Sequence, residues 1–343
     1  MRPIETLARD GVVVIAEIGC NHNGDLGLAM RLVEAAARAG ADAAKFQSFV
    51  PAEMIIRAAP KAQYQFGKTD PRESQYARLE RLRLDAEAHR ALVRCCQANG
   101  IAFCSSPFDE PSADLLESLG VPFFKVPSGE ITNLPLLRRI ASFGRPMVIS
   151  TGMADLGEIE EALETVGPAA NRAVLLHCTS DYPADWKTMN LRAMQTMAAA
   201  FKRPIGLSDH SEGIELPLVA VGMGAVVIEK HLTLDRNMEG GDHLASLEPE
   251  DFARMVGKIR ALEEALGDGV KRCHPVEENI RVVARKSLVA RARIARGQRI
   301  DAGMLAVKRP GTGIAPKHLD DIVGRSAREA IEADQVLQWS DLS

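Results

Sequence analysis

The chain has 343 residues, and its 42 Lys and Arg residues nearly balance its 46 Asp and Glu residues, for a net charge of -4. This balance gives no electrostatic footprint for nucleic acid or for an anionic membrane, so the expected partners are small molecules. The sequence begins without a signal-peptide pattern and contains no apolar stretch of about 18 residues, which predicts a cytoplasmic protein.

Short apolar runs of strand length alternate with amphipathic runs of helix length from the start of the chain. VVVIAEIG (12–19) precedes LGLAMRLVEAAARAG (26–40), which ends on a glycine that stops a helix, and ADAAKFQSF (41–49) is the next strand. The alternation continues to give eight strands, which is typical of a (β/α)8 TIM barrel. The expected strands are 12–19, 41–49, 101–106, 121–130, 146–151, 173–179, 203–210 and 225–231.

Two segments depart from this pattern. Residues 51–75 are too polar and irregular for a core and are expected to form a loop over the barrel mouth. Short strands and turns replace the alternation near the C-terminus. We therefore predict a barrel domain over 1–268, a linker over 269–285 and a small β-rich domain over 286–343, which is marginal alone because of its size.

Polar side chains stand at the end of every expected strand. Because catalytic groups of a parallel barrel come from the C-terminal strand ends, we expect them to share one rim. Singly, each has a simpler interpretation: Lys45 as a snorkelling surface residue, Ser150 as part of a turn, His177 as a core histidine. Their common placement favours a shared site. The strand-end residues are Glu17, Lys45, Gln47, Ser105, Ser106, Lys125, Ser128, Glu130, Ser150, Thr151, His177, Thr179, Ser208, Asp209, His210, Glu229 and His231.

Two kinds of ligand follow from these residue types. Lys45 and Lys125 among serine hydroxyls describe a pocket for a doubly anionic small molecule, because ammonium groups supply charge and hydroxyls supply geometry. His210 and His231 end neighbouring strands, so their imidazoles could reach one divalent ion. Without a thiolate nearby, Mn²⁺ or Mg²⁺ is favoured over structural Zn²⁺. The competing interpretation is a pair of capping or core histidines.

At these residues the sequence resembles the sialic acid synthase family, whose members condense phosphoenolpyruvate with an N-acylated hexose. The segment from ARKSLVARARIARGQRI through KRPGTGI resembles that family's C-terminal antifreeze-like (SAF) domain, a β-clip fold. The resemblance covers nearly the whole chain, in the family's order of motifs. The motifs are AEIGCNHNGD (16–25), KFQSF (45–49), PFFKVPSGEITNLP (122–135), ISTGM (149–153), LHCTSDYP (176–183), GLSDHS (206–211) and IEKHLTLD (228–235).

The resemblance implies roles for individual residues. A divalent metal, Mn²⁺ with Mg²⁺ or Co²⁺ as alternatives, would lie on two histidines. Arg309 would reach the acylamino group of the acceptor from a partner subunit, which requires a domain-swapped homodimer. The implied sets are Lys45, Ser106, Lys125, Ser128, Ser150 and Ser208 for phosphoenolpyruvate; Gln47, Glu130, Tyr182, Asp242 and Arg309 for the sugar; His210 and His231 for the metal; and Glu17, Lys45, Glu130 and Glu229 as catalytic residues.

The sequence departs from the family pattern at three positions. Ser106 stands where the family often has Thr, Ser180 where some members carry Asn near phosphoenolpyruvate, and Gly241 replaces a Pro before Asp242. Ser106 keeps the hydroxyl. Ser180 puts one ligand contact in question, and Gly241 is expected to loosen the loop that positions Asp242.

The resemblance implies an enzyme that forms a carbon–carbon bond and releases phosphate by cleavage of its C–O bond. The acceptor expected first is N-acetylmannosamine, which gives N-acetylneuraminate. One alternative is 2,4-diacetamido-2,4,6-trideoxymannose, which gives legionaminate. Others are a pseudaminate synthase and a barrel synthase for a sugar phosphate, which would need more Arg or Lys on the rim. The least favoured alternative is a non-catalytic carbohydrate-binding protein.

Overall fold

The computed structural model describes residues 11–61 and 72–343. The chain divides into two compact units, Met1–Gly267 and Asp268–Ser343. The division lies beside residue 268, the predicted end of the barrel domain. The predicted linker over 269–285 contains two short helices, η6 (Pro275–Glu277) and α12 (Glu278–Ala284).

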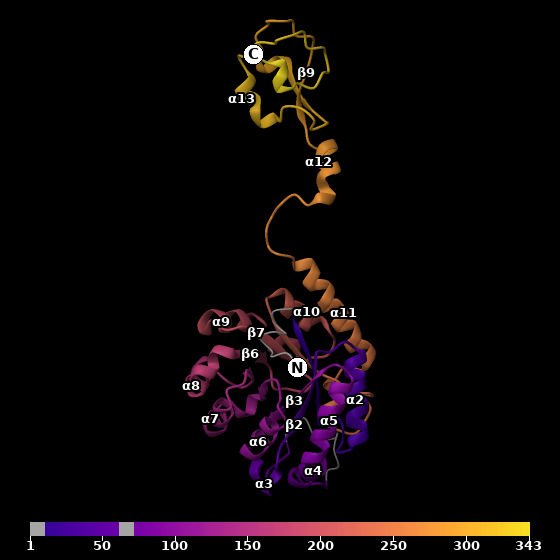
Figure 1. The fold of residues 1–343 in the computed structure, drawn as a ribbon, viewed down its shortest axis with the longest axis vertical. Coiled ribbons are helices and arrows are strands. Elements are labelled where there is room, and N and C mark those ends of the chain that lie inside the picture. The colour runs from indigo at the N-terminus through magenta and orange to yellow at the C-terminus, as the bar shows by residue number, and fades with distance from the viewer. Residues whose placement is uncertain (1–10, 62–71) are drawn as a thin grey trace. The chain divides into compact units, whose positions relative to one another are not determined.

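The first unit is built on eight parallel strands that alternate with helices (Figure 1). Strand β1 pairs with both β2 and β8, and β3 contacts β4, the two strands at the ends of the hydrogen-bonded order. The predicted (β/α)8 TIM barrel is confirmed. The strands are β1 (Val13–Gly19), β2 (Ala43–Ser48), β3 (Ala102–Pro107), β4 (Phe124–Val126), β5 (Met147–Ser150), β6 (Ala173–Cys178), β7 (Ile205–Asp209) and β8 (Val227–His231).

Aspartate side chains begin several of the surrounding helices. Asp25, Asp85 and Asp109 each accept a hydrogen bond from a first-turn amide, and Asp155 forms a capping box with Glu158. These caps satisfy amides that have no partner inside the helix, so each helix begins at a defined residue. The helices are α2 (Leu26–Arg38), α3 (Pro51–Met54), α4 (Gln75–Leu82), α5 (Ala86–Ala98), α6 (Glu110–Ser118), α7 (Leu134–Ser142), α8 (Leu156–Val166), α9 (Arg192–Phe201), α10 (Glu215–Gly222) and α11 (Pro249–Leu266).

Alternation along the strands separates two apolar layers. In β1, Val13 and Ile15 belong to the cluster inside the barrel, whereas Val14 and Ala16 belong to the cluster between strands and helices. Side chains two residues apart share a face of a strand, so Glu17 continues the inner row beyond Ile15. The inner rows begin with apolar side chains such as Val13, Ala43, Val148 and Val227 and become polar toward the C-terminal ends of the strands.

The second unit has a small apolar core of its own. Strands β9 (Ser287–Ala290) and β10 (Leu305–Lys308) pair antiparallel, and α13 (Leu319–Ile322) follows them. Leu288, Ile300 and Leu337 are buried in this core. A small β-rich unit at the C-terminus agrees with the predicted SAF domain.

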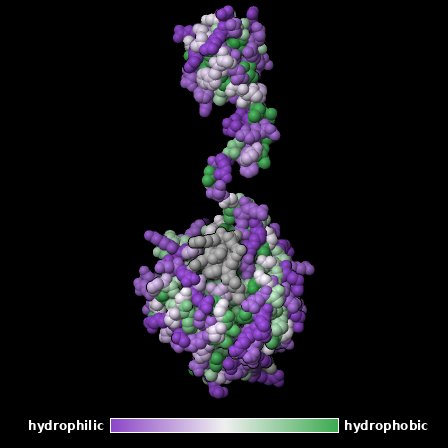
Figure 2. All heavy atoms as spheres, in the orientation of Figure 1, coloured by the Kyte–Doolittle hydropathy of each residue, from purple (hydrophilic) through white to green (hydrophobic). Residues whose placement is uncertain are grey.

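Hydrophilic residues cover much of the visible face of the first unit, and hydrophobic residues lie between them in scattered groups (Figure 2). Within residues 11–61 and 72–343, no helix combines the length and the apolar character needed to cross a membrane.

Candidate active site

A cavity of about 440 Å³ lies at the C-terminal ends of the barrel strands. Parallel strands bring these ends to one side of the sheet, so residues far apart in the sequence meet there. Most of the predicted site residues line this cavity. They are Glu17, Lys45, Gln47, Ser106, Lys125, Ser128, Ser150, Tyr182, Ser208, His210, Glu229, His231 and Asp242.

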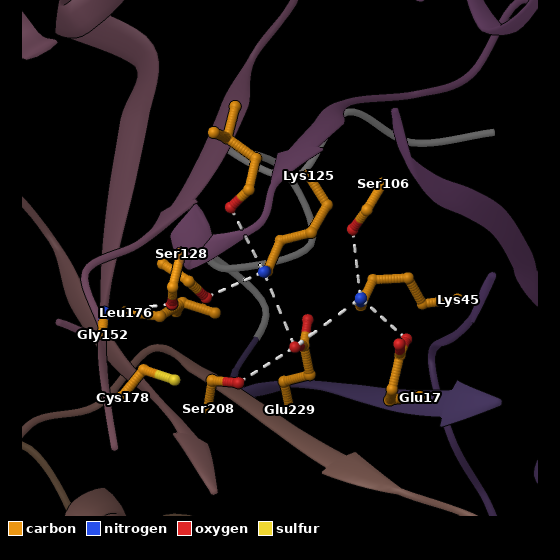
Figure 3. A network of polar contacts seen from close by, with 12 residues as sticks. Glu17, Lys45, Ser106, Lys125, Ser128, Gly152, Leu176, Cys178, Ser208 and Glu229 are labelled. Carbon is orange, nitrogen blue, oxygen red and sulfur yellow. Dashed lines mark hydrogen bonds and ion pairs between the residues drawn. The ribbon is translucent and has the colours of Figure 1, made fainter. Parts of the chain in front are cut away.

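Four charged side chains form a buried network in the cavity (Figure 3). Lys45 Nζ lies 2.7 Å from Glu17 Oε2 and 3.7 Å from Glu229 Oε1, and Lys125 Nζ lies 3.6 Å from the same Glu229 oxygen. None of these side chains is more than 5% exposed. The pairing is necessary because an isolated buried charge is far more costly than a compensated one. Glu229 therefore serves two lysines at once.

Serine hydroxyls contact both ammonium groups. Lys45 Nζ donates to Ser106 Oγ at 3.2 Å, and Lys125 Nζ donates to Ser150 Oγ at 2.8 Å. Ammonium groups next to hydroxyls on neighbouring strands provide both the charge and the directed donors that a small anion requires. The structure thus brings together the lysine and serine residues of the predicted anion pocket.

The two carboxylates of the network differ in their protonation. Burial raises the pKa of Glu17 to about 7, with Lys45 opposing and Glu229 adding to the rise. Burial also opposes ionisation of Glu229, but Lys125, Lys45 and a 3.0 Å hydrogen bond from Ser208 bring its pKa below the usual value. At neutral pH, Glu229 is therefore an anion, whereas Glu17 can gain or lose a proton.

His210 and His231 lie next to each other, with ring centroids 5.4 Å apart. His210 Nδ1 is 2.7 Å from the Thr179 carbonyl, to which Nδ1–H donates, and 3.8 Å from Cys178 Sγ. Burial opposes protonation of His210, but Cys178 and the Thr179 carbonyl raise its pKa above the usual value, so a thiol lies beside the histidine pair where the sequence predicted none. His231 Nδ1 is buried without a hydrogen-bond partner among the described residues. Burial, with neighbouring positive groups, holds the pKa of His231 well below its usual range, so the ring is neutral.

The neutral imidazole of His231 has a free nitrogen and is a suitable metal ligand, and His210 would bind an ion through Nε2 in its deprotonated form. The described part of the chain contains no cluster of three or more His, Cys, Asp or Glu side chains arranged for a metal ion. A divalent ion held by this histidine pair would therefore complete its coordination with water or substrate. The residues fit an open, catalytic type of metal site better than a closed structural one.

Three of the five residues predicted to face the sugar line the cavity. Tyr182 follows β6, and its ring centroid lies 4.1 Å from that of His210. Gln47 on β2 donates from Nε2 to Glu17 Oε1 at 3.2 Å. Asp242 precedes η5 (His243–Ala245) and also lines the cavity. These side chains share the cavity with the lysine network.

The positions that depart from the family pattern lie close to the site. Ser180 lines the cavity, and a Cβ added to Gly152 would come within 2.4 Å of Ser180 Oγ. The backbone of Gly152 and the Ser180 side chain therefore occupy adjoining space. Gly241 is buried immediately before Asp242. The predicted loosening of this loop stays a prediction.

Two of the amino acids predicted to bind the sugar do not line the cavity. Glu130 ends the short helix η2 (Ser128–Glu130), where it is half-buried and accepts a 2.7 Å hydrogen bond from Asn133 Nδ2. Arg309 belongs to the second unit, where its Nε donates to the Ala284 carbonyl at 3.0 Å. The proposed roles of Glu130 and Arg309 stay predictions.

One strand-end histidine has a structural role. His177 Nε2 lies 2.6 Å from the Met189 carbonyl, and His177 does not line the cavity. Its simpler interpretation, a hydrogen-bonded core histidine, agrees with these contacts.

Sequence reasoning missed the contribution of the insert after β2 to the cavity wall. Met54 of α3 and Gln75, Arg78 and Leu79 of α4 line the cavity. The expected loop over 51–75 thus begins with a helix and ends at another, while residues 62–71 lie outside the described part of the chain. The spacing of residues 75, 78, 79 and 82 is a helical signal that could have identified α4.

The comparisons with known proteins agree with this site. The NeuB family model matches residues 32–271, and the SAF domain model matches residues 285–343. An N,N'-diacetyllegionaminic acid synthase from Campylobacter jejuni is 46% identical over 95% of this chain and 98% of its own length. An enzyme of the same name from Legionella pneumophila is 46% identical over 96% of this chain and 94% of its length.

A solved structure adds the fold-level comparison. The N-acetylneuraminic acid (sialic acid) synthetase of Leptospira borgpetersenii, in complex with citrate, is 36% identical with a TM-score of 0.70, covering 79% of this chain and 90% of that one. The NeuB match covers more than half of the chain, and the Campylobacter relative is matched over nearly its full length. This chain therefore belongs to the NeuB family of acid synthases and ends in a SAF domain.

Proposed function

We propose that the chain is a nonulosonic acid synthase that condenses phosphoenolpyruvate with 2,4-diacetamido-2,4,6-trideoxymannose. The observation that carries the reaction class is the buried pair Lys45 and Lys125, held by carboxylates and serines at the barrel mouth. The 46% identity to two N,N'-diacetyllegionaminic acid synthases, against 36% to the N-acetylneuraminic acid synthetase, supports this acceptor over N-acetylmannosamine, which the sequence interpretation placed first.

In this proposal the lysine and serine pocket binds and orients phosphoenolpyruvate. Lys45 and Lys125 neutralise its phosphate and carboxylate groups, and the hydroxyls of Ser106, Ser150 and Ser208 fix its orientation. Held in this way, C3 of phosphoenolpyruvate attacks the aldehyde carbon of the acceptor. The new carbon–carbon bond forms, the aldehyde oxygen takes a proton, and positive charge develops at C2.

The two buried carboxylates then have separate tasks. Ionised Glu229 stabilises the positive charge at C2. Glu17, with its pKa near 7, takes a proton from the water that adds to C2. The C2–O bond to phosphate breaks, the new C2 hydroxyl loses its proton to become the keto oxygen, and phosphate leaves with the bridging oxygen.

His210 and His231 would hold a divalent ion, Mn²⁺ in this proposal, which supplies Lewis acidity toward the aldehyde oxygen of the acceptor. Adding Mn²⁺ should raise the thermal unfolding midpoint, because an ion that binds only the folded state stabilises it. His231→Ala should lose this rise and abolish turnover while keeping the circular dichroism spectrum. His274→Ala, at an exposed position in the second unit, is the control. A full Mn²⁺ response in His231→Ala would mean that the histidines are structural.

The experiment that tests the function is phosphate release from phosphoenolpyruvate in the presence of Mn²⁺. The diacetamido sugar and N-acetylmannosamine are compared, each with and without a chelator. We expect chelator-sensitive release that is faster with the diacetamido sugar. Faster release with N-acetylmannosamine would reassign the acceptor, and no release with either would refute the proposed function.

Isotopically heavy oxygen in the solvent water tests the cleavage step. Because water adds at C2 and the bridging oxygen leaves with phosphate, the label should appear in the keto acid before any exchange and be absent from phosphate. Label in the phosphate would refute C–O cleavage.

A further inference from the structure

The inner face of α4 presents polar groups to the cavity. Gln75, Arg78, Leu79 and Leu82 follow helical spacing and therefore share one face. Leu79 and Leu82 pack against Phe49 in a small apolar cluster, which fixes the helix against the barrel. Gln75, Arg78 and Leu79 line the cavity. The apolar contacts of Leu79 and Leu82 thus fix the position of α4, and with it the positions of Gln75 and Arg78 at the cavity wall.

These two polar groups are prepared for a ligand. Arg78 is only 6% exposed, although arginine is rarely buried without a partner. The nearby Glu73 is engaged by Arg81, with hydrogen bonds of 3.0 and 3.1 Å. Gln75 Oε1 is buried and accepts no hydrogen bond from any described residue. A buried acceptor without a donor is costly, and a bound molecule would remove that cost.

The surroundings define the chemistry of this ligand. Arg78 offers donors, Gln75 Oε1 offers an acceptor, and Met54, Leu79 and Phe108 provide apolar surface beside them on the cavity wall. A secondary amide with a methyl group meets all three: its carbonyl accepts from Arg78, its N–H donates to Gln75, and its methyl contacts the apolar side chains. A phosphate group would place an oxygen anion against the Gln75 acceptor and leave the apolar surface unused.

We propose that Gln75 and Arg78 form a subsite for an acylamino group of the acceptor that is remote from its aldehyde. The inference rests on the proposed function and deepens it. The lysines and histidines that act on the reacting carbons lie on the strands or, for His210, directly after one, so α4 meets another part of the sugar. In the diacetamido sugar this group is the acetamide on C4, which N-acetylmannosamine lacks.

The test compares two acceptors that differ only at C4, 2,4-diacetamido-2,4,6-trideoxymannose and 2-acetamido-2,6-dideoxymannose of matching configuration. We measure kcat/KM for both with the wild type, Arg78→Met and Gln75→Leu, and with Arg83→Met as a control on the exposed end of α4. Arg78→Met should lower the preference for the diacetamido sugar by about 10- to 100-fold, and Gln75→Leu by about 10-fold. The KM for phosphoenolpyruvate should not change, which also shows that the variants are folded.

Three outcomes would overturn the subsite. In the first, the variants keep the wild-type preference for the diacetamido sugar. In the second, kcat/KM falls by the same factor for both acceptors, which would indicate a general structural role. Alternatively, the wild type could prefer N-acetylmannosamine 6-phosphate and lose that preference in Arg78→Met, which would make Arg78 a phosphate ligand. Failure of the proposed function is distinct, because the wild type would then release no phosphate with any of these acceptors.

Discussion

Glu17 and Glu229 approach the same lysine from neighbouring strands, yet their pKa values move in opposite directions. Glu229 has a second lysine and a serine hydroxyl beside it, whereas burial dominates at Glu17. Two titratable groups whose pKa values are separated in this way can divide charge stabilisation and proton transfer between them. The sequence places Lys45, Lys125 and Ser208 on the same rim, but only the structure shows which carboxylate each of them contacts.

The pKa of Glu17 predicts the pH dependence of the reaction. A base must be ionised, and a carboxyl with a pKa of about 7 in the free enzyme is mostly protonated below that pH, so kcat/KM for phosphoenolpyruvate should rise between about pH 6 and pH 8. Glu17→Gln should remove this rise and lower kcat/KM by about 10²- to 10⁴-fold. Steady-state rates across the pH range make the measurement, with Glu160→Gln on an exposed position of α8 as control. An unchanged profile in Glu17→Gln would exclude Glu17 as the base.

At the residue scale, strand-end chemistry could be predicted because the chain alternates regularly. Glu17, Lys45 and Glu229 each continue an inner apolar row, so the sequence predicts that they meet. Glu130 shows the limit of this reasoning. It lies in a short 3-10 helix, where each residue is rotated by about 120° from the one before, so residues two apart do not share a face as they do in a strand. The Ser128 side chain can therefore face the cavity while that of Glu130 does not.

At the element scale, β7 and β8 are joined by a buried ion pair on their outer face. Lys230 Nζ lies 2.6 Å from Asp209 Oδ2, and both side chains are 0% exposed. Lys230 also donates to the Ser211 carbonyl, and Asp209 Oδ1 accepts from the Ser211 amide and hydroxyl. These contacts fix the turn that carries His210. Because Lys230 alternates with Glu229 and His231 along β8, its side chain points to the helix side of the sheet, but the pattern does not identify Asp209 as its partner.

Removal of one partner should destabilise the barrel strongly. Lys230→Met leaves a buried carboxylate uncompensated, so the free energy of unfolding should fall by about 3–5 kcal/mol. The double variant Asp209→Leu with Lys230→Met should recover part of this loss. Urea denaturation measures the free energy of unfolding of the single and the double variant. For comparison, Arg38→Met breaks the exposed pair with Glu34 and should cost less than about 1 kcal/mol. A similarly small loss in Lys230→Met would contradict the prediction.

The insert after β2 shows why element prediction failed locally. Its composition is polar and irregular, which favours a loop, but α4 is stabilised by tertiary packing of Leu79 and Leu82 on Phe49. A Ser74 cap also begins the helix. The sequence places this insert at the barrel mouth, but only the fold shows that its last part is helical and that Gln75 and Arg78 line the cavity.

At the scale of the whole molecule, the role that the family resemblance implies for Arg309 requires two subunits, because the implied contact is with the acceptor bound to a partner. The sequence predicts both units from their motifs, but the assembly stays a prediction from family resemblance. We propose a homodimer in which Arg309 of the partner subunit reaches the acylamino group of the acceptor. Arg309→Ala should then raise the KM for the sugar far more than the KM for phosphoenolpyruvate.

Mixed dimers test this exchange directly. His231→Ala and Arg309→Ala should each be nearly inactive at low sugar concentration. In a randomly reassembled mixture, half of the dimers contain one of each chain, and each of these has one complete site, so about one quarter of wild-type activity should return. Analytical ultracentrifugation measures whether the variants and their mixture are dimers. A mixture no more active than its components would contradict a shared site.

The buried network has a thermodynamic consequence for the binding of phosphoenolpyruvate in the proposed reaction. Phosphoenolpyruvate brings negative charge next to Glu17, which raises the pKa of that carboxyl further, so binding should draw a proton from the solution. The uptake should be small at pH 6, where Glu17 is already largely protonated, and larger at pH 8. The heat of binding at pH 8 should therefore depend on the ionisation enthalpy of the buffer in titration calorimetry, and Glu17→Gln should remove much of this dependence. Equal heats in all buffers would mean that the lysines accept the anion without any exchange of protons with the solvent.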